Sequence, residues 1–199
     1  MDRQAIVSSS KRVSWLLRHG APEQGIPMDA AGWVAVADVL RALRMSEAQL
    51  DAVVGQNDKL RFERQGERIR ACQGHSAAGL SLEALEASWA PFEGEGPVFH
   101  GTSVDAALSI AREGVSAQAR SHVHLAPSRQ SKVGKRWNVD VLLVVAPERV
   151  RAHGLALFES PNGVILARRI PADCVTGIDA LTRRAQAQIT GLRAAFGIG

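Results

Sequence analysis

Apolar residues recur at helical spacing in three stretches near the start of the chain, at residues 8–19, 36–43 and 46–55. Gly20 follows the first stretch and is expected to end that helix in a left-handed conformation. Residues 60–72 then alternate apolar and polar side chains about a glycine-containing turn, which predicts a β-hairpin. The first part of the chain is therefore expected to hold three helices followed by a two-stranded wing.

That order of elements is typical of a winged helix-turn-helix, and the alternation in the hairpin puts Arg61, Arg68 and Arg70 on its polar face. Residues 91–97 are rich in proline, glycine and glutamate, which favours a linker. We therefore expect two lobes, a winged-helix-like RNA-binding lobe at residues 1–90 and a second lobe at residues 91–199.

Beyond residue 97 short apolar stretches alternate with turns, which predicts strands and helices in mixed order. Thr102 with Asp105 is expected to cap a helix that Gly114 ends. The predicted strands cover residues 98–100, 122–125, 139–145, 155–158 and 164–166, with a short helix at 128–135 and a helix in the last 20 residues. The fold class that follows is α+β.

Composition narrows the class of protein. The chain has 199 residues, a net charge of +4 and a pI of about 9.7, which suits a polyanionic partner if the arginines cluster. Its two cysteines exclude a disulfide framework or a four-cysteine zinc site. With no signal peptide pattern and no apolar run of membrane-spanning length, a cytoplasmic location without a membrane partner is expected.

Four basic residues are candidates for phosphate chemistry: Arg18, His19, Arg70 and Arg136. A guanidinium presents a planar fork that grips phosphate oxygens, and a neighbouring histidine can exchange protons near neutral pH. Any one of them alone is more simply explained as a solvated surface charge.

His100, Gly101 and Thr102 lie between a predicted strand and a predicted helix. The glycine would let a ligand approach the backbone, and the helix N-terminus could face an anion, although an ordinary turn explains the same spacing. His122 and His124 share one face of a strand, but no acidic residue lies nearby to complete a metal site, so no metal is expected. The sequence has neither a P-loop nor a Rossmann glycine motif.

Short motifs in one fixed order resemble the RNA 2′-phosphotransferase family, also called the tRNA-splicing 2′-phosphotransferases. The matching stretches are Leu16-Leu17-Arg18-His19, Gly32-Trp33-Val34, Asn57-Asp58-Lys59 with Arg61-Phe62, Ile69-Arg70-Ala71-Cys72-Gln73-Gly74-His75-Ser76, His100-Gly101-Thr102, His122-Val123-His124-Leu125, Val133-Gly134-Lys135-Arg136 and Ser160-Pro161-Asn162-Gly163-Val164. Each motif alone is weak, but the ordered set across roughly residues 10 to 170 is specific.

The resemblance implies a winged-helix-like lobe joined to an ADP-ribosyltransferase-like lobe that binds NAD, with the active site between them. It implies transfer of an internal RNA 2′-phosphate to NAD without a metal. The phosphate first displaces nicotinamide from the ribose, giving an ADP-ribosylated RNA. The neighbouring ribose hydroxyl then attacks the phosphorus, which releases RNA with a 2′-hydroxyl and ADP-ribose 1″,2″-cyclic phosphate. Roles in tRNA splicing or RNA repair, and action as a monomer, follow from the same resemblance.

The resemblance also assigns residues. Arg18, Arg70 and Arg136 would clamp the phosphate, with His19 moving a proton in the second step. His100, Gly101, Thr102 and His124 would contact NAD. The glutamate with which protein-modifying relatives activate an acceptor falls near Val164, which argues against protein ADP-ribosylation. Trp137-Asn138 replaces the His-Gly common in bacterial members, directly after Arg136.

Two other functions remain open at this stage. The chain could be a winged-helix nucleic-acid-binding module without turnover, or an enzyme that ADP-ribosylates phosphorylated nucleic-acid ends and stops after the first step. Consumption of NAD separates the first of these from an enzyme. The physiological RNA that carries the 2′-phosphate is not specified by any motif.

Overall fold

A computed structural model describes residues 2–56, 60–76, 80–131, 133–134 and 139–199. The chain divides into two compact units. Unit 1 comprises Met1–Trp89 together with Ala119–Ser121, and unit 2 comprises Ala90–Gln118 and His122–Gly199. The short segment Ala119–Ser121 therefore belongs with unit 1. The predicted division into residues 1–90 and 91–199 placed this segment in the second lobe.

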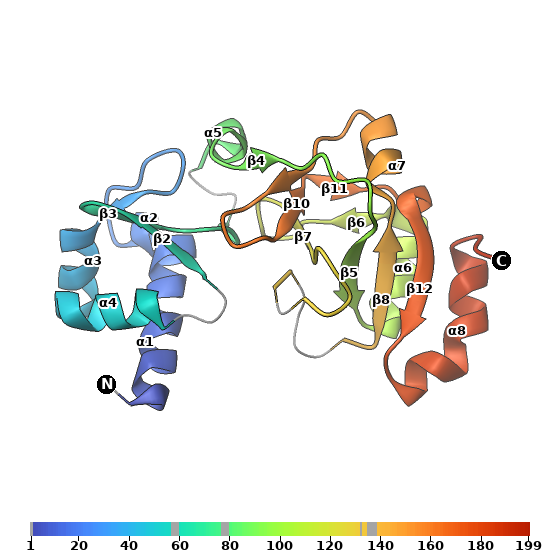
Figure 1. Ribbon diagram of the computed structural model, residues 1–199, viewed down its shortest axis with the longest axis horizontal. Helices are drawn as coiled ribbons and strands as arrows, with labels where there is room; N and C mark the ends of the chain where they lie inside the picture. Colours follow the sequence, from blue (N-terminus) through green and yellow to red (C-terminus); the bar gives the residue numbers. More distant parts are fainter. Residues whose placement is uncertain (1, 57–59, 77–79, 132, 135–138) are drawn as a thin grey trace. The chain divides into compact units, whose positions relative to one another are not determined.

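Helices α1, α3 and α4 of unit 1 enclose an apolar core that includes Leu16, Leu17 and Leu50 (Figure 1). The helices of this unit are α1 (Arg3–Trp15), the π-helix η1 (Leu16–Gly20), α2 (Ala21–Glu23), α3 (Val36–Leu43), α4 (Glu47–Gly55) and α5 (Leu82–Ala87). The capping box of Ser46 and Gln49 begins α4, as predicted. Helix α1 begins earlier than expected because the Asp2 side chain accepts a hydrogen bond from the Ala5 amide, at 2.7 Å.

The expected left-handed helix end at Gly20 is wrong. Gly20 has φ −82° and ψ −20°, and the chain continues through a wide π-turn into α2. A glycine suits this position for packing, because a β-carbon at residue 20 would come within 2.5 Å of the partly exposed Trp15 ring, which would have to shift. The left-handed residue comes later, at Gly25.

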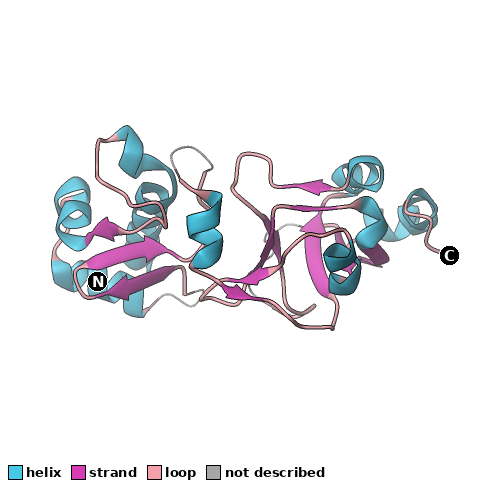
Figure 2. Ribbon diagram, turned by 90° about the horizontal axis from the view of Figure 1, so that it is seen from above, coloured by secondary structure: helices cyan, strands magenta, loops and turns pink. Residues whose placement is uncertain are grey.

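A three-stranded antiparallel sheet in the order β1-β3-β2 completes unit 1. Its strands are β1 (Val34–Ala35), β2 (Phe62–Gln65) and β3 (Arg68–Ala71). The predicted hairpin is the β2–β3 pair, drawn as two long neighbouring arrows close to the N-terminus in Figure 2. Because Gln65 pairs with Arg68, the turn consists of Gly66 and Glu67, one residue later than predicted.

Unit 2 is built from antiparallel strands in three sheets, ordered β4-β9-β10-β7, β11-β6 and β12-β8-β5. The strands are β4 (Ala90–Pro91), β5 (Val98–Thr102), β6 (Val115–Ser116), β7 (Val123–Leu125), β8 (Val141–Val145), β9 (Phe158–Glu159), β10 (Ile165–Ala167), β11 (Arg169–Ile170) and β12 (Val175–Ala180). The predicted linker at residues 91–97 is held on this unit, since the Phe92 amide donates to the Leu157 carbonyl at 2.8 Å.

The helices of unit 2 pack on its largest apolar core, and Figure 1 shows α8 lying along β12. They are α6 (Val104–Glu113), α7 (Pro147–Ala152), the 3-10 helix η2 (Ala172–Cys174) and α8 (Arg183–Ala195). The helix expected at residues 128–135 is wrong for the described positions, where 128–130 form bends and turns. Both units combine helices with antiparallel strands, so the fold class is α+β. Among the described residues, no helix has the length and apolar composition that crossing a bilayer requires.

Candidate functional site

The π-turn η1 positions the two candidate residues of the first motif. Its wider winding is closed by the hydrogen bond from the Ala21 amide to the Leu16 carbonyl, five residues back. Leu16 and Leu17 are fully buried in the core of unit 1. Arg18 and His19 are consequently turned to the half-buried side of the helix, at its boundary with solvent.

The guanidinium of Arg18 lies in a close-fitting setting. A β-carbon at residue 74 would be 3.3 Å from its Cζ and Nε atoms, so the absence of a side chain at Gly74 leaves room for it. The carbonyl of Arg18 accepts hydrogen bonds from the Ser76 amide at 3.1 Å and from the Ser76 hydroxyl at 3.3 Å. The segment that follows Gln73 therefore anchors the backbone of Arg18 as well as flanking its side chain.

One nitrogen of this guanidinium lacks a hydrogen-bond partner. The Nε atom of Arg18 is buried, and it has no partner among the described residues. A buried donor on a charged group costs free energy when it is left unsatisfied, so such groups usually have a partner in the working protein. The position marks a place where an anion would satisfy the donor.

The neighbouring charges that lower the pKa of Arg18 belong to other arginines. Burial lowers the pKa of Arg18 to about 10, with further lowering by the charges of Arg120 and Arg61. Only Cys72 acts in the opposite direction, and burial raises the pKa of that thiol to about 12, so at neutral pH it carries no charge. The charges of two further guanidinium groups therefore act on Arg18. Among the described groups that shift the pKa of Arg18, none is a carboxylate.

His19 lies in the same electrostatic field. Burial lowers its pKa from the ordinary value of 6.5, and the charges of Arg18 and Arg120 lower it further, against a smaller opposite effect of Glu23. The imidazole is therefore neutral at physiological pH and has a lone pair to accept a proton.

Arg70 is in a different environment from the polar hairpin face that the alternation predicted. Only 4% of the residue is exposed, and its guanidinium contacts the Glu63 carboxylate at 2.6 and 2.8 Å. Glu63 is its direct cross-strand partner, and the ring of Trp33 lies 4.6 Å from the guanidinium carbon. The exposed polar setting expected for Arg70 is therefore wrong, because a carboxylate and an aromatic ring enclose it.

Arg61 and Arg120 are the basic residues that sequence reasoning left out of the candidate set. Arg120 reaches unit 1 because residues 76 and 120 form a β-bridge and the Ser121 amide donates to the His75 carbonyl at 3.0 Å. Arg61 stood in the quoted Arg61-Phe62 motif, and Arg120 stands two residues before His122. Both signals were present, but the sequence does not show that the charges of Arg61 and Arg120 act on Arg18.

Arg136 falls outside the described residues, so its expected role stays a prediction. The preceding turn is fixed: Gly134 has φ +74°, and a β-carbon there would come within 2.4 Å of the Leu125 carbonyl oxygen. The backbone at Gly134 therefore lies against the end of β7, and only glycine fits that approach.

The residues proposed for NAD lie on neighbouring strands of unit 2. His100 is on β5 and His124 on β7, and the Nδ1 atom of His100 is 3.2 Å from the His124 carbonyl oxygen. Because a carbonyl oxygen only accepts, this contact places the proton of a neutral His100 on Nδ1 and its acceptor lone pair on Nε2. Both residues are half-buried.

The helix cap predicted at Thr102 is wrong. Thr102 ends β5, and Ser103 caps α6 by accepting from the Ala106 amide at 3.3 Å. The Asp140 carboxylate accepts from the Val104 amide at 3.2 Å, so a fixed negative charge already occupies this helix end. The N-terminus of α6 is therefore not the anion site that the sequence suggested.

Gly101 is required by packing in this structure. A β-carbon on it would lie 2.7 Å from Cγ1 of Val139. We expect Gly101→Ala to lower the free energy of unfolding by about 1 to 3 kcal/mol through overpacking. Chemical denaturation measures this change, and the double variant Gly101→Ala with Val139→Ala should recover part of it. Weakened NAD binding at unchanged stability would instead show that the glycine serves the ligand directly.

The α+β fold thus carries a buried guanidinium donor under the influence of further positive charges, an arrangement suited to an anionic ligand. Residues 4–169 match the family described as RNA 2′-phosphotransferase, Tpt1 / KptA family. The chain belongs to this family of transferases, as the ordered motifs indicated.

Curated relatives support the assignment over nearly their whole length. A probable RNA 2′-phosphotransferase of Streptomyces griseus is 36% identical over 187 residues, covering 86% of this chain and 96% of the relative. One from Pseudomonas aeruginosa is 35% identical over 180 residues, with the same two coverages. One from Agrobacterium fabrum is 35% identical over 178 residues, covering 85% and 92%.

Proposed function

We propose that this protein removes an internal 2′-phosphate from RNA by transferring it to NAD, and that Arg18, with Arg61 and Arg120, binds that phosphate. The observation that carries the proposal is the buried Nε of Arg18, which lacks a partner among the described residues in a region already rich in positive charge. A phosphate oxygen supplies both the missing acceptor and the missing negative charge.

An RNA phosphate suits this cluster better than a single carboxylate does. Two or three guanidinium forks can divide the oxygens of one phosphate among them and stabilise the charge that accumulates during transfer. Arg61 and Arg120 replace Arg70 in this proposal, since Arg70 already has Glu63 as its counter-ion. Arg136 remains a predicted fourth contact.

His19 is the proposed proton acceptor of the second step. A hydroxyl attacks phosphorus effectively when a base removes its proton, and a neutral imidazole does so near neutral pH. The neighbouring arginines keep His19 neutral before the phosphate binds. A bound phosphate would offset their effect and raise the proton affinity of His19 when it is needed.

NAD is the proposed acceptor of the phosphate and supplies an electrophilic ribose carbon with nicotinamide as leaving group. The proposal that this chain binds NAD rests on His100 and His124, whose half-buried side chains lie on neighbouring strands. With its proton on Nδ1, His100 presents Nε2 as an acceptor suited to a ribose hydroxyl. Thr102 and Gly101 complete the proposed contact segment, through backbone and hydroxyl groups.

The same proposal extends to the lobes. The three helices and hairpin of unit 1 support a winged-helix-like RNA-binding role, and the antiparallel sheets of unit 2 support an ADP-ribosyltransferase-like NAD-binding role. We propose that the protein acts as a monomer, without a catalytic metal.

The proposed function is tested with a short RNA that carries one internal 2′-phosphate, incubated with the purified protein with and without NAD. We expect loss of the phosphate only with NAD, together with release of ADP-ribose cyclic phosphate and nicotinamide. The same RNA without the 2′-phosphate is the control and should consume no NAD. RNA binding without NAD consumption, or an ADP-ribosylated RNA that persists, would each overturn the proposal.

A nuclear magnetic resonance titration of His19 tests its electrostatic environment. We expect a midpoint below 6.5 in the free protein, because burial and the charges of Arg18 and Arg120 disfavour the imidazolium. In Arg120→Ala the midpoint should rise, since one of these charges is gone. Comparison with His19→Gln assigns the resonance. A midpoint at or above 6.5 in the parent protein contradicts the proposed cluster.

A further inference from the structure

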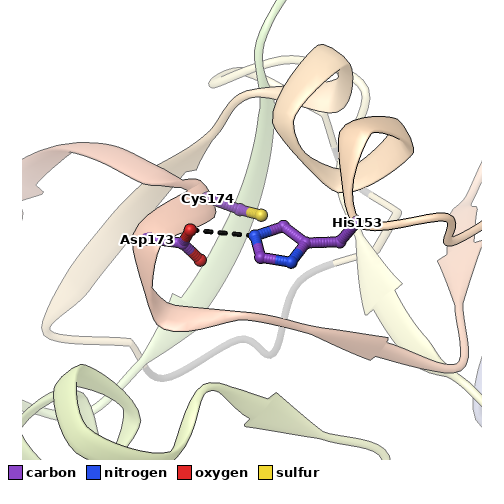
Figure 3. Close-up of side chains that lie close together, drawn as sticks. All are labelled: His153, Asp173 and Cys174. Carbon is purple, nitrogen blue, oxygen red and sulfur yellow. Dashed lines mark hydrogen bonds and ion pairs between the residues drawn. The ribbon is translucent and has the colours of Figure 1, made fainter.

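A second group of chemically reactive side chains lies on unit 2 and shares no residue with the candidate site described above. His153 follows helix α7, and Asp173 and Cys174 are adjacent residues of the 3-10 helix η2. Figure 3 shows the three side chains pointing toward one another. The Nε2 atom of His153 is 2.8 Å from Oδ2 of Asp173, and one nitrogen, one oxygen and one sulfur atom all lie within 4.8 Å of one another.

The backbone around this group is held by its own hydrogen bonds. The Arg149 side chain donates to the Asp173 carbonyl at 2.9 Å, and the Ala146 amide donates to the Cys174 carbonyl at 3.0 Å. These contacts join the N-cap and the third residue of α7 to η2. The three side chains are therefore presented by segments that are already fixed relative to each other, which lowers the cost of ordering them around a ligand.

The Cys-His-Asp composition has two chemical uses, and the placement of the cysteine separates them. A nucleophilic thiol has to reach its substrate, but Cys174 is fully buried. Metal ligation needs only that the sulfur lies near the other donor atoms, and here it lies within 4.8 Å of the ligand atoms of His153 and Asp173. The arrangement therefore favours a metal site over a nucleophile.

The geometry and the donor atoms suit a zinc-class ion. Zinc–ligand bonds of about 2.0 to 2.3 Å put tetrahedral ligand atoms roughly 3 to 4 Å apart, close to the spacing seen here. Sulfur and imidazole donors favour zinc and its neighbours over calcium or magnesium, which prefer oxygen. The side chains of His153 and Asp173 are 39% and 67% exposed, so an ion can enter from solvent and keep a water as fourth ligand.

We propose that His153, Asp173 and Cys174 form a zinc-class divalent metal site that ties α7 to η2. Binding forms a metal–sulfur bond and releases the Cys174 thiol proton to solvent. The metal takes the Nε2 position of His153, whose proton moves through solvent to Nδ1. The site contributes to the stability of unit 2 and takes no part in the phosphate transfer proposed above, so it stands or falls independently of that function.

The test uses Co²⁺ as a spectroscopic probe on the full-length protein, with a phosphine reductant to keep the thiols reduced. A thiolate ligand gives cobalt a charge-transfer absorption band in the near ultraviolet, and tetrahedral coordination gives visible bands. We expect a saturable titration with one equivalent of Co²⁺, and loss of the bands when Zn²⁺ is added, since zinc binds such sites more tightly.

Matched variants identify the ligands. Cys174→Ser should abolish the charge-transfer band, whereas Cys72→Ser, which changes the other buried cysteine, should retain it. His153→Gln and Asp173→Asn alter exposed side chains and should leave the fold intact while weakening Co²⁺ binding by at least about tenfold. No saturable band in the parent protein, a band lost with Cys72, or full affinity in His153→Gln would each overturn the proposal.

Discussion

Arg18→Ala is expected to lower the rate of RNA 2′-phosphate transfer by about 10²- to 10³-fold, the effect typical of removing one preorganised donor from a developing charge. The same substitution should leave the melting temperature unchanged or raise it. Both results come from one cause, because the Arg18 guanidinium is subject to other positive charges and its buried Nε lacks an acceptor among the described residues. Single-turnover kinetics and a thermal melt of the same preparation measure the two effects.

The stability effect has a definite sign. The pKa of Arg18 is lowered to about 10 in the folded protein, from 12.5, so folding disfavours its charged form. This destabilisation is fully present at pH 7, below both values, and is relieved only as the pH rises through about 10. Inorganic phosphate should therefore stabilise the parent protein by binding the cluster, and should stabilise Arg18→Ala less.

Arg12→Ala is the matched control, on helix α1, which directly precedes the π-turn that holds Arg18. The Arg12 side chain donates to the Leu43 carbonyl at 2.6 Å, where it satisfies the end of α3. We expect this variant to melt at a lower temperature and to retain its rate, which is the reverse of the Arg18→Ala pattern. If Arg18→Ala lost stability and activity together, its guanidinium would be a structural group, and the proposed phosphate site would fail.

Local signals in the sequence predicted most elements but misplaced several ends. The capping box at Ser46 and the strand predicted at residues 139–145 depend on neighbouring residues; the capping box was correct, and the strand is present but begins two residues later, at Val141. Gly20 was misread because its requirement comes from the Trp15 ring rather than from backbone conformation. The strand β12 was not predicted, since its pairing with β8 is a long-range contact that a short pattern does not reveal.

In the candidate site, too, local motifs were informative, whereas arrangements that depend on distant segments were missed. Arg18 and His19 were identified from their motif, and the structure gives them the charged, half-buried setting that phosphate chemistry needs. The alternation of the hairpin suggested an exposed Arg70, but burial of that side chain depends on Glu63 across the strand and on Trp33 from another segment. The assembly of Arg120 with Arg18 depends on a segment 100 residues away in sequence joining unit 1, which no local pattern indicates.

Arg120→Ala and Arg70→Ala should separate a phosphate-binding arginine from a structural one. Arg120 is exposed and its charge acts on Arg18, so its loss should reduce phosphate transfer by about 10²- to 10³-fold. Arg70→Ala should lower the free energy of unfolding by about 2 to 3 kcal/mol, because it leaves Glu63 partly buried without its counter-ion.

Activity per folded molecule decides between the two sets of arginines. With Arg120 in the site, folded Arg70→Ala retains activity within about threefold of the parent, and Arg70→Met combined with Glu63→Gln recovers stability because no buried charge is left unpaired. If folded Arg70→Ala instead lost activity about 10²-fold while Arg120→Ala kept it, the phosphate clamp expected from the motifs would hold. The ion pair with Glu63 would then orient a catalytic guanidinium, and the cluster around Arg18 would need another explanation.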